Sequence, residues 1–239
     1  MKRRFKKLFP ESILGLYRKF RTGYRFITRK LSDRKARKQY LELINERYPE
    51  ISKWKDKGCV LDLGANLGHF SAAALSLGFR VISVEPHPTA FRYLENRFAK
   101  DPNVILVNKA VSNKNSKINL QLHPDHFRDP LVTSLSATII VEKFEEPHDV
   151  VEVETITFSE LISMSDKFSI VKIDIEGAEI YLFDEIVTEY EKIQNLLLET
   201  HKRFMLADST LYDYTKGLGT LEDCIVRNNL QGKWHTDWV

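Results

Sequence analysis

The sequence of 239 residues lacks the features that would place a protein in a membrane or in an oxidising compartment. Its two cysteines, Cys59 and Cys224, lie far apart without metal-ligand spacing, which fits a reduced cytoplasmic setting. No apolar run approaches the roughly 20 residues that span a bilayer. No apolar stretch with a small-residue cleavage site follows the basic N-terminus. These absences predict a cytoplasmic protein with a core of its own.

The net charge of +3 conceals an uneven distribution. Residues 1–57 contain 19 Lys and Arg against 6 Asp and Glu, whereas residues 58–239 contain 17 against 27. We therefore expect a basic N-terminal segment, 1–57, attached to an acidic body, 58–239. The segment should be helical, with one helix between Pro10 and Gly23 and another that begins at Asp33.

Two roles for the basic segment are open. It is either a solvated appendage docked on the body, or a surface attracted to an anionic membrane or a polyanionic substrate. Nucleic acid is a weaker alternative, because a basic patch binds any polyanion and specifies none.

Residues 60–69, Val-Leu-Asp-Leu-Gly-Ala-Asn-Leu-Gly-His, predict a buried strand, a glycine turn and the start of a helix. Such a turn leaves backbone N–H groups at the helix start and allows a ligand to approach closely where Cβ atoms are missing. Asp62 is expected to bind that ligand, because a buried carboxylate needs a partner. The spacing differs from the Gly-x-Gly-x-x-Gly fingerprint of dinucleotide-binding folds.

Strands and helices alternate along the body, with apolar runs at 80–84, 104–107, 170–175 and 196–198. The alternation predicts an α/β fold with a mostly parallel, Rossmann-like sheet and helices on both faces. Four strands end in polar side chains: Asp62, Glu85, Asp174 with Glu176, and Glu199 with His201. Single acids could cap the helices that follow, but the whole set favours a ligand site at the carboxyl edge of the sheet.

Residues 112–157 interrupt this alternation. Apolar and polar residues alternate at 118–122 and at 151–156, which predicts an antiparallel pair of strands. The polar stretch between them is expected to be a lid or a substrate loop. The tail after residue 202 has one expected element, a short helix near 220–228.

Four motifs occur together in an order that resembles the FkbM-type methyltransferases: residues 62–71, 84–88 (Val-Glu-Pro-His-Pro), 171–179 (Val-Lys-Ile-Asp-Ile-Glu-Gly-Ala-Glu) and 198–201 (Leu-Glu-Thr-His). The resemblance covers about 58–202. It implies the seven-stranded class I methyltransferase sheet and O-methyl transfer from S-adenosylmethionine. One departure, Thr157-Phe158-Ser159 in place of Thr-Leu-Asp, is expected only to change the entry into a helix.

The resemblance also implies site residues. Asp62, Gly64, Asn66 and Gly68 would hold the methionine end of the cofactor, and the backbone around Ala110 would contact the adenine. Glu85, at the tip of the second strand, would accept hydrogen bonds from the ribose hydroxyls.

Methyl transfer to a hydroxyl requires a group that takes up its proton. His201 is the first candidate for this base, because an ordinary histidine pKa lies near the operating pH. Asp174 is the second, either as base or as an anchor for the acceptor hydroxyl, and Glu199 completes the expected catalytic set. Alternatively, Asp174, Glu176 and Glu199 hold Mg²⁺, which prefers carboxylate and water ligands.

The sequence thus predicts an S-adenosylmethionine-dependent O-methyltransferase whose acceptor is a small molecule or glycan, with a sugar hydroxyl of a glycan or glycolipid favoured by family analogy. One alternative is a nucleic-acid methyltransferase, which the acidic body and the lack of an Asn-Pro-Pro-Tyr/Phe strand tip disfavour. Another is a non-catalytic module that binds the nucleoside cofactor. The expected location is cytoplasmic, with peripheral membrane contact through residues 1–57.

Overall fold

The computed structural model describes residues 33–53, 57–123, 137–140, 149–205 and 207–236. Its main sheet has six strands in the order β3-β2-β1-β7-β8-β9, and all neighbouring strands are parallel. The strands are β1 (Cys59–Leu63), β2 (Arg80–Val84), β3 (Val104–Val107), β7 (Phe168–Ile173), β8 (Leu196–Leu198) and β9 (Trp234–His235). The chain runs outward from β1 to β3 and then returns to the other side of β1, so a ligand crevice is expected beside the carboxyl end of β1.

The predicted α/β fold is confirmed, and most strands occupy the expected residues. The main difference is β7, which was expected at 170–175 but ends at Ile173. Asp174 therefore lies just beyond the strand, at the carboxyl edge of the sheet.

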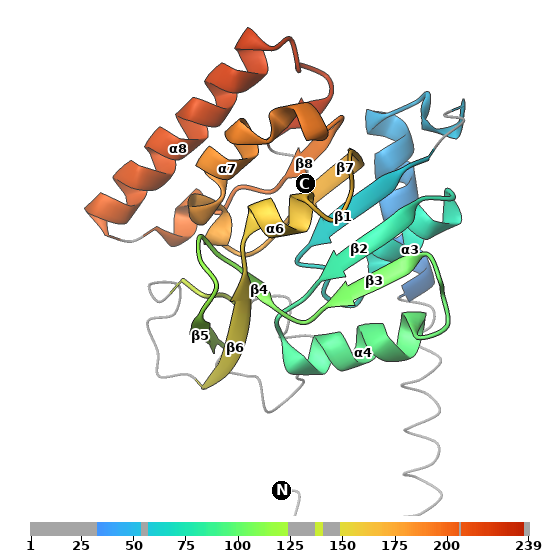
Figure 1. Ribbon diagram of the computed structural model, residues 1–239, viewed down its shortest axis with the longest axis horizontal. Helices are drawn as coiled ribbons and strands as arrows, with labels where there is room; N and C mark the ends of the chain where they lie inside the picture. Colours follow the sequence, from blue (N-terminus) through green and yellow to red (C-terminus); the bar gives the residue numbers. More distant parts are fainter. Residues whose placement is uncertain (1–32, 54–56, 124–136, 141–148, 206, 237–239) are drawn as a thin grey trace, which may run out of the picture.

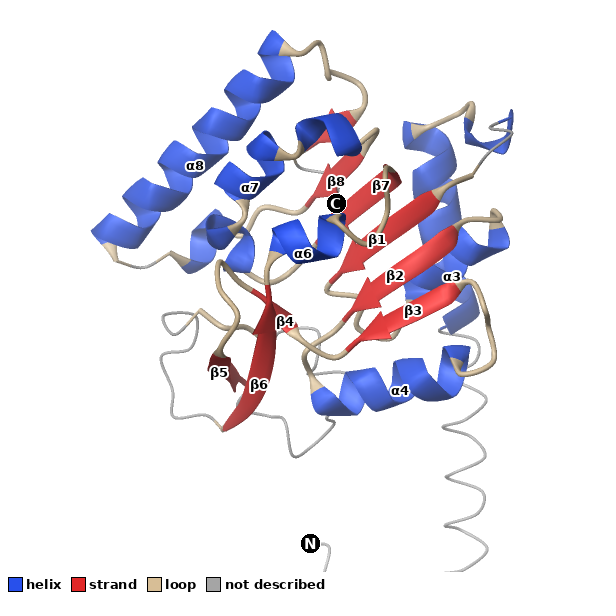
Figure 2. Ribbon diagram, in the orientation of Figure 1, coloured by secondary structure: helices blue, strands red, loops and turns tan. Residues whose placement is uncertain are grey.

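Helices cover both faces of the sheet, as Figures 1 and 2 show. On one face lie the helix over 33–47, α3 (His69–Ser76) and α4 (Pro88–Phe98). On the other lie α6 (Phe158–Ile162), α7 (Phe183–Thr188) and α8 (Asp208–Arg227). Short 3-10 helices connect these elements: η1 (Ile51–Lys53), η4 (Ala178–Tyr181), η5 (Tyr190–Lys192) and η6 (Lys202–Phe204). Thr157 caps α6 in a capping box with Glu160, so the departure from the family pattern does fall at a helix entry.

The helix over 33–47 belongs to the hydrophobic core. Ile44 and Tyr48 are buried in one cluster with Val60 of β1 and Phe70 of α3. Asp33, the first described residue of this helix, accepts a hydrogen bond of 2.6 Å from Tyr93 of α4. This part of the basic segment therefore covers one face of the sheet. The helix predicted between Pro10 and Gly23, and any contact that residues 1–32 make with a membrane, lie outside the described residues.

A small second sheet has the order β4-β6-β5, from β4 (Ala110–Val111), β5 (Lys117–Gln121) and β6 (Val150–Ile156). β5 and β6 are antiparallel, which confirms the pairing expected from the alternation, and β4 pairs with β6 in parallel. Of the polar stretch between β5 and β6, most lies outside the described residues; Thr138 is described and pairs with Gln121.

The C-terminal region differs from the prediction. The short helix expected near 220–228 is instead α8, 20 residues long. Gly217, within α8, allows α8 to approach α7, because a Cβ there would lie 2.5 Å from the ring of Phe183. Within the described residues the main sheet has six strands, not the seven that the resemblance implied. In the same part of the chain, no helix combines the length and the apolar character needed to cross a bilayer.

Candidate active site

A pocket lies at the carboxyl ends of β1, β2 and β7, and residues of the small sheet form its other wall. The empty space of the pocket is about 570 Å³ when its open mouth is included. Its walls combine carboxylates with apolar side chains and backbone; the lining residues are Gly64, Asn66, Val84, Glu85, Pro86, Lys109, Ala110, Val111, Leu120, Ala137, Thr138, Ile139, Asp174, Ile175, Glu176 and Ala178.

Four of the six residues predicted to hold the cofactor line this pocket: Gly64, Asn66, Glu85 and Ala110. Gly68 does not. It precedes α3 with a φ of 70°, and a Cβ there would lie 2.5 Å from the ring of Phe98 and 2.6 Å from Leu94. The packing of α4 thus requires this glycine, and its predicted contact with the cofactor finds no support in the pocket wall.

Gly64 lines the pocket, but a close approach within the protein also requires it to be glycine. Its φ is 74°, and a Cβ would lie 1.8 Å from the carbonyl oxygen of Asp174. The loop after β1 therefore rests directly on the backbone at the end of β7. This contact joins the predicted cofactor loop to the predicted catalytic strand end.

Glu85 is buried at the tip of β2 and organises the loops around the pocket. Its Oε2 accepts a hydrogen bond of 2.8 Å from the backbone N–H of Asn66. Its Oε1 accepts a hydrogen bond of 2.8 Å from the backbone N–H of His87. Burial raises the pKa of Glu85 to about 7, although these hydrogen bonds oppose the rise. The carboxylate is thus placed where a ligand hydroxyl could donate to it.

Asp62 lies beneath the glycine loop and does not reach the pocket wall. Its Oδ2 accepts a hydrogen bond of 2.6 Å from Ser71, and its Oδ1 lies 3.4 Å from Nζ of Lys172. The register of β1 and β7 sets Asp62 beside Lys172. Since Nζ also donates to the carbonyl oxygens of Leu63 (3.3 Å) and Gly64 (2.9 Å), the pair supports the loop from below.

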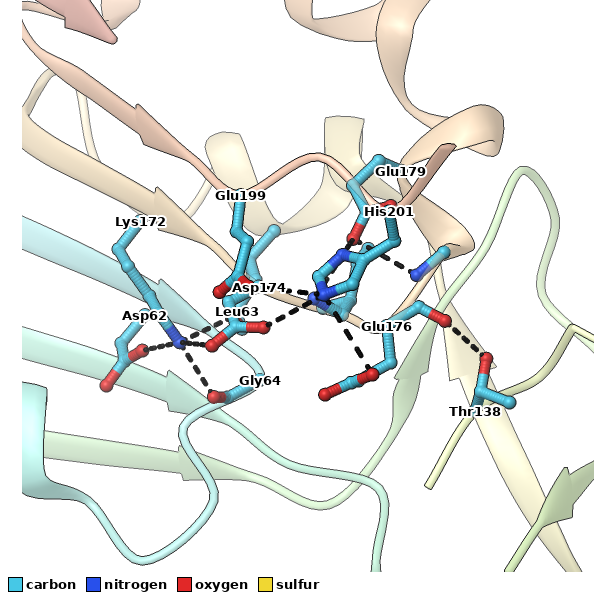
Figure 3. Close-up of polar contacts among 12 residues, drawn as sticks. Asp62, Leu63, Gly64, Thr138, Lys172, Asp174, Glu176, Glu179, Glu199 and His201 are labelled. Atoms are coloured by element: carbon cyan, nitrogen blue, oxygen red, sulfur yellow. Dashed lines mark hydrogen bonds and ion pairs between the residues drawn. The ribbon is translucent and has the colours of Figure 1, made fainter. Parts of the chain in front are cut away.

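The predicted catalytic residues come together next to this pair (Figure 3). His201 is buried after β8, and its Nε2 faces three carboxylates. The distances from Nε2 are 3.6 Å to Oε1 of Glu199, 3.9 Å to Oδ1 of Asp174 and 3.9 Å to Oε2 of Glu176. These three side chains are about one quarter exposed, whereas that of His201 is 2% exposed. An incoming molecule would therefore meet the carboxylates first.

The charges of this cluster change how its members titrate. Burial by itself would lower the pKa of His201, but the hydrogen bond with Glu179 and the nearby carboxylates raise it above its ordinary value. Burial, followed by repulsion from Asp174, raises the pKa of Glu199.

The cluster resembles a magnesium site in its carboxylates but not in its histidine. Among the described residues, Asp174, Glu176 and His201 each place a ligand atom within 4.8 Å of the others. The sequence predicted Glu199, not His201, as the third ligand. An imidazole nitrogen suits Zn²⁺ or Fe²⁺ better than Mg²⁺, which strongly prefers oxygen. The donor set therefore does not favour the predicted Mg²⁺.

Two buried residues beside the site, Lys172 and Glu179, were not among the predicted site residues. Lys172 precedes Asp174 by two residues, and side chains two residues apart in an extended chain point to the same side. The proximity of Lys172 to Asp174 therefore follows from the sequence. The partnership of Glu179 with His201 had no local signal, because 22 residues separate them. Tyr40 was also missed: burial raises the pKa of its hydroxyl, and the charges of Lys172 and Asp174 act on it.

Comparison with known proteins agrees with this geometry. The family model of the methyltransferase FkbM domain matches residues 62–205, which is more than half of the chain. The matched range contains all the residues that line the pocket and the His201 cluster. A search of curated proteins found no match. The chain belongs to the FkbM methyltransferase family.

Proposed function

We propose that this protein is an S-adenosylmethionine-dependent O-methyltransferase that acts on a hydroxyl of a neutral sugar in a glycan or glycolipid. The observation that carries the proposal is the position of the pocket. It joins the glycine loop and Glu85 on one side to Asp174 and Glu176 on the other. A bound cofactor and an acceptor hydroxyl would thus meet beside His201.

The first part of the proposal concerns the cofactor. When bound, S-adenosylmethionine supplies an electrophilic methyl group on a cationic sulfur. Glu85 would accept hydrogen bonds from the ribose, the loop at Gly64 and Asn66 would hold the methionine end, and Ala110 would lie against the adenine. Asp62 acts from beneath, by holding Lys172 and the loop in place. The fit is supported by the walls of the pocket, which combine carboxylates with apolar side chains and backbone.

The second part concerns the proton of the acceptor. His201 is proposed as the base that receives this proton at Nε2. Asp174, Glu176 and Glu199, 3.6–3.9 Å from Nε2, would then stabilise the positive charge that forms on the ring. Because these carboxylates are the exposed members of the cluster, they would also accept hydrogen bonds from the acceptor hydroxyls and so align the acceptor. Mg²⁺ has no step in this proposal.

The acidity of the cluster also favours one acceptor class. Carboxylates accept hydrogen bonds from neutral polyols but repel phosphates. A sugar hydroxyl therefore fits this acidic cluster better than a nucleic acid does. The alternative of a non-catalytic binding module is disfavoured by the polar groups that converge on His201.

One experiment separates the three possibilities. The purified protein is incubated with S-adenosylmethionine and either neutral glycans and glycolipids or RNA, and formation of S-adenosylhomocysteine is measured. Turnover with neutral sugars supports the proposal. Turnover with RNA alone would favour the nucleic-acid alternative. Saturable cofactor binding without turnover on any acceptor would favour the binding module.

A cytoplasmic location with peripheral attachment to anionic membranes is proposed from the charge of residues 1–57. The test is sedimentation with vesicles that contain or lack anionic lipid, at low and high salt. Equal binding to vesicles with and without anionic lipid would contradict the proposed attachment.

A further inference from the structure

Hydrogen-bond donors from three parts of the chain converge on the buried carboxylate of Glu179. Its Oε1 accepts from the backbone N–H of Ile175 at 3.2 Å and of Gly177 at 3.3 Å. The same Oε1 lies 3.0 Å from Nδ1 of His201, and Oε2 accepts from the hydroxyl of Tyr214 at 3.4 Å. Glu179 itself is 0% exposed. So many partners for a side chain that reaches neither the pocket wall nor solvent indicate a supporting role toward the site.

These contacts decide which nitrogen of His201 carries hydrogen. A backbone amide can only donate, so Oε1, which already receives two amides, must act as an acceptor. The short contact between Oε1 and Nδ1 therefore requires hydrogen on Nδ1. In the neutral ring, Nε2 then has the lone pair and faces Asp174, Glu176 and Glu199 (Figure 3). This is the tautomer that a base acting through Nε2 needs.

We propose that Glu179 is a positioning residue that fixes the Nδ1–H tautomer and the ring orientation of His201. The proposal rests on the proposed function in one respect, namely that His201 acts as the base. In this arrangement His201 acts as the base through Nε2, and Glu179 orients the ring through the other nitrogen, Nδ1. Glu179 acts through His201 and does not touch the acceptor.

The same carboxylate fixes the turn that presents the neighbouring acids. The turn has an unusual backbone, with φ of 57° at Glu176 and 104° at Gly177, and Glu179 binds the amides on either side of Glu176. Tyr214 of α8 completes the arrangement, because its hydroxyl accepts a hydrogen bond of 2.9 Å from the backbone N–H of His201. Glu179 thus holds both sides of the cluster, the histidine and the acidic turn.

The decisive test uses nuclear magnetic resonance of the full-length protein labelled with ¹⁵N histidine. The signals of His201 are identified by their absence in His201→Gln, and the pH is raised until the ring is neutral. A neutral imidazole in water prefers hydrogen on Nε2. We therefore expect the opposite tautomer, Nδ1–H, in the protein. Hydrogen on Nε2 would overturn the proposal, whether or not an acceptor is known.

Two variants assign the effect to Glu179. Glu179→Gln keeps the size of the side chain but removes its charge, and we expect kcat to fall about 10- to 100-fold with KM for S-adenosylmethionine nearly unchanged. Tyr214→Phe perturbs the same buried cluster but leaves the carboxylate, so the Nδ1–H signature should persist. Loss of that signature in Tyr214→Phe, or a normal kcat in Glu179→Gln, would contradict the proposal.

The tests also separate this proposal from the function on which it rests. Absence of turnover on every acceptor would end the proposed function, while the tautomer would still be measurable. If Glu179→Gln fails to fold, as circular dichroism would reveal, the tautomer of the unmodified protein decides the question by itself.

Discussion

Asp62 and Lys172 form an ion pair between two adjacent parallel strands, with 3.4 Å between Oδ1 and Nζ and almost no exposure of either residue. The same Nζ lies 3.4 Å from Oδ2 of Asp174. One buried cation therefore connects the loop assigned to the cofactor with the carboxylate assigned to the acceptor.

Lys172→Met should destabilise the fold by about 3–5 kcal/mol, because it leaves the carboxylate of Asp62 buried without a counter-charge. The double variant Asp62→Asn, Lys172→Met should recover much of the loss. Urea unfolding measures both. Lys38→Met, which breaks an exposed pair with Glu42, is the control and should change little. Equal losses in the single and double variants would show that Asp62 does not need the cation.

Glu85→Ala should weaken S-adenosylmethionine binding at least about tenfold. The variant loses a charged acceptor for the ribose hydroxyls and also the hydrogen bond that holds the backbone amide of Asn66 in place. Titration calorimetry gives the dissociation constant. Glu95→Gln removes an exposed carboxylate from α4 and should leave affinity unchanged. Unaltered affinity in Glu85→Ala would refute the assignment of the pocket.

The affinity for S-adenosylmethionine should increase with pH around neutrality. The pKa of Glu85 is raised to about 7, so its carboxylate is mostly protonated at pH 6 and mostly ionised at pH 8. The ionised form is the stronger acceptor for ribose hydroxyls, which predicts a gain of up to about tenfold over this range. Calorimetry at several pH values measures it. In Glu85→Gln the gain should disappear; its persistence would assign it to another group.

Gly64→Ala should both destabilise the protein by more than about 1 kcal/mol and weaken cofactor binding, because the new Cβ would overlap the carbonyl oxygen of Asp174 at a positive φ. Gly219→Ala is the matched control. No atom lies within 4 Å of a Cβ at that position in α8, so alanine should stabilise the helix by about 0.5–1 kcal/mol. Thermal unfolding and calorimetry test the pair, and a stable, binding-competent Gly64→Ala would contradict the packing argument.

His201→Gln should lower kcat by about 10²–10⁴-fold while the dissociation constant of S-adenosylmethionine stays within about twofold, since His201 is proposed to act on the acceptor proton. Steady-state kinetics and calorimetry give the two quantities. His235→Gln, on the edge strand β9, is the control. A parallel loss of binding and turnover would remove His201 from the role of base.

Local pattern in the sequence determined the fold class, most strand positions, a helix over 33–47 and the convergence of acids at one sheet edge. These features follow from the spacing of apolar residues along a short stretch of chain, which records burial and local geometry. The pattern also indicated four residues that line the pocket, Gly64, Asn66, Glu85 and Ala110.

Only the tertiary structure decided which groups are partners. Asp62 was expected to face the ligand, but strand order and register place it against Lys172, and Gly68 serves the packing of α4. Glu179 meets His201 across two different elements. The reason is physical: periodicity fixes which face of an element is buried, while charge pairs and close approaches depend on how separate elements are aligned in space.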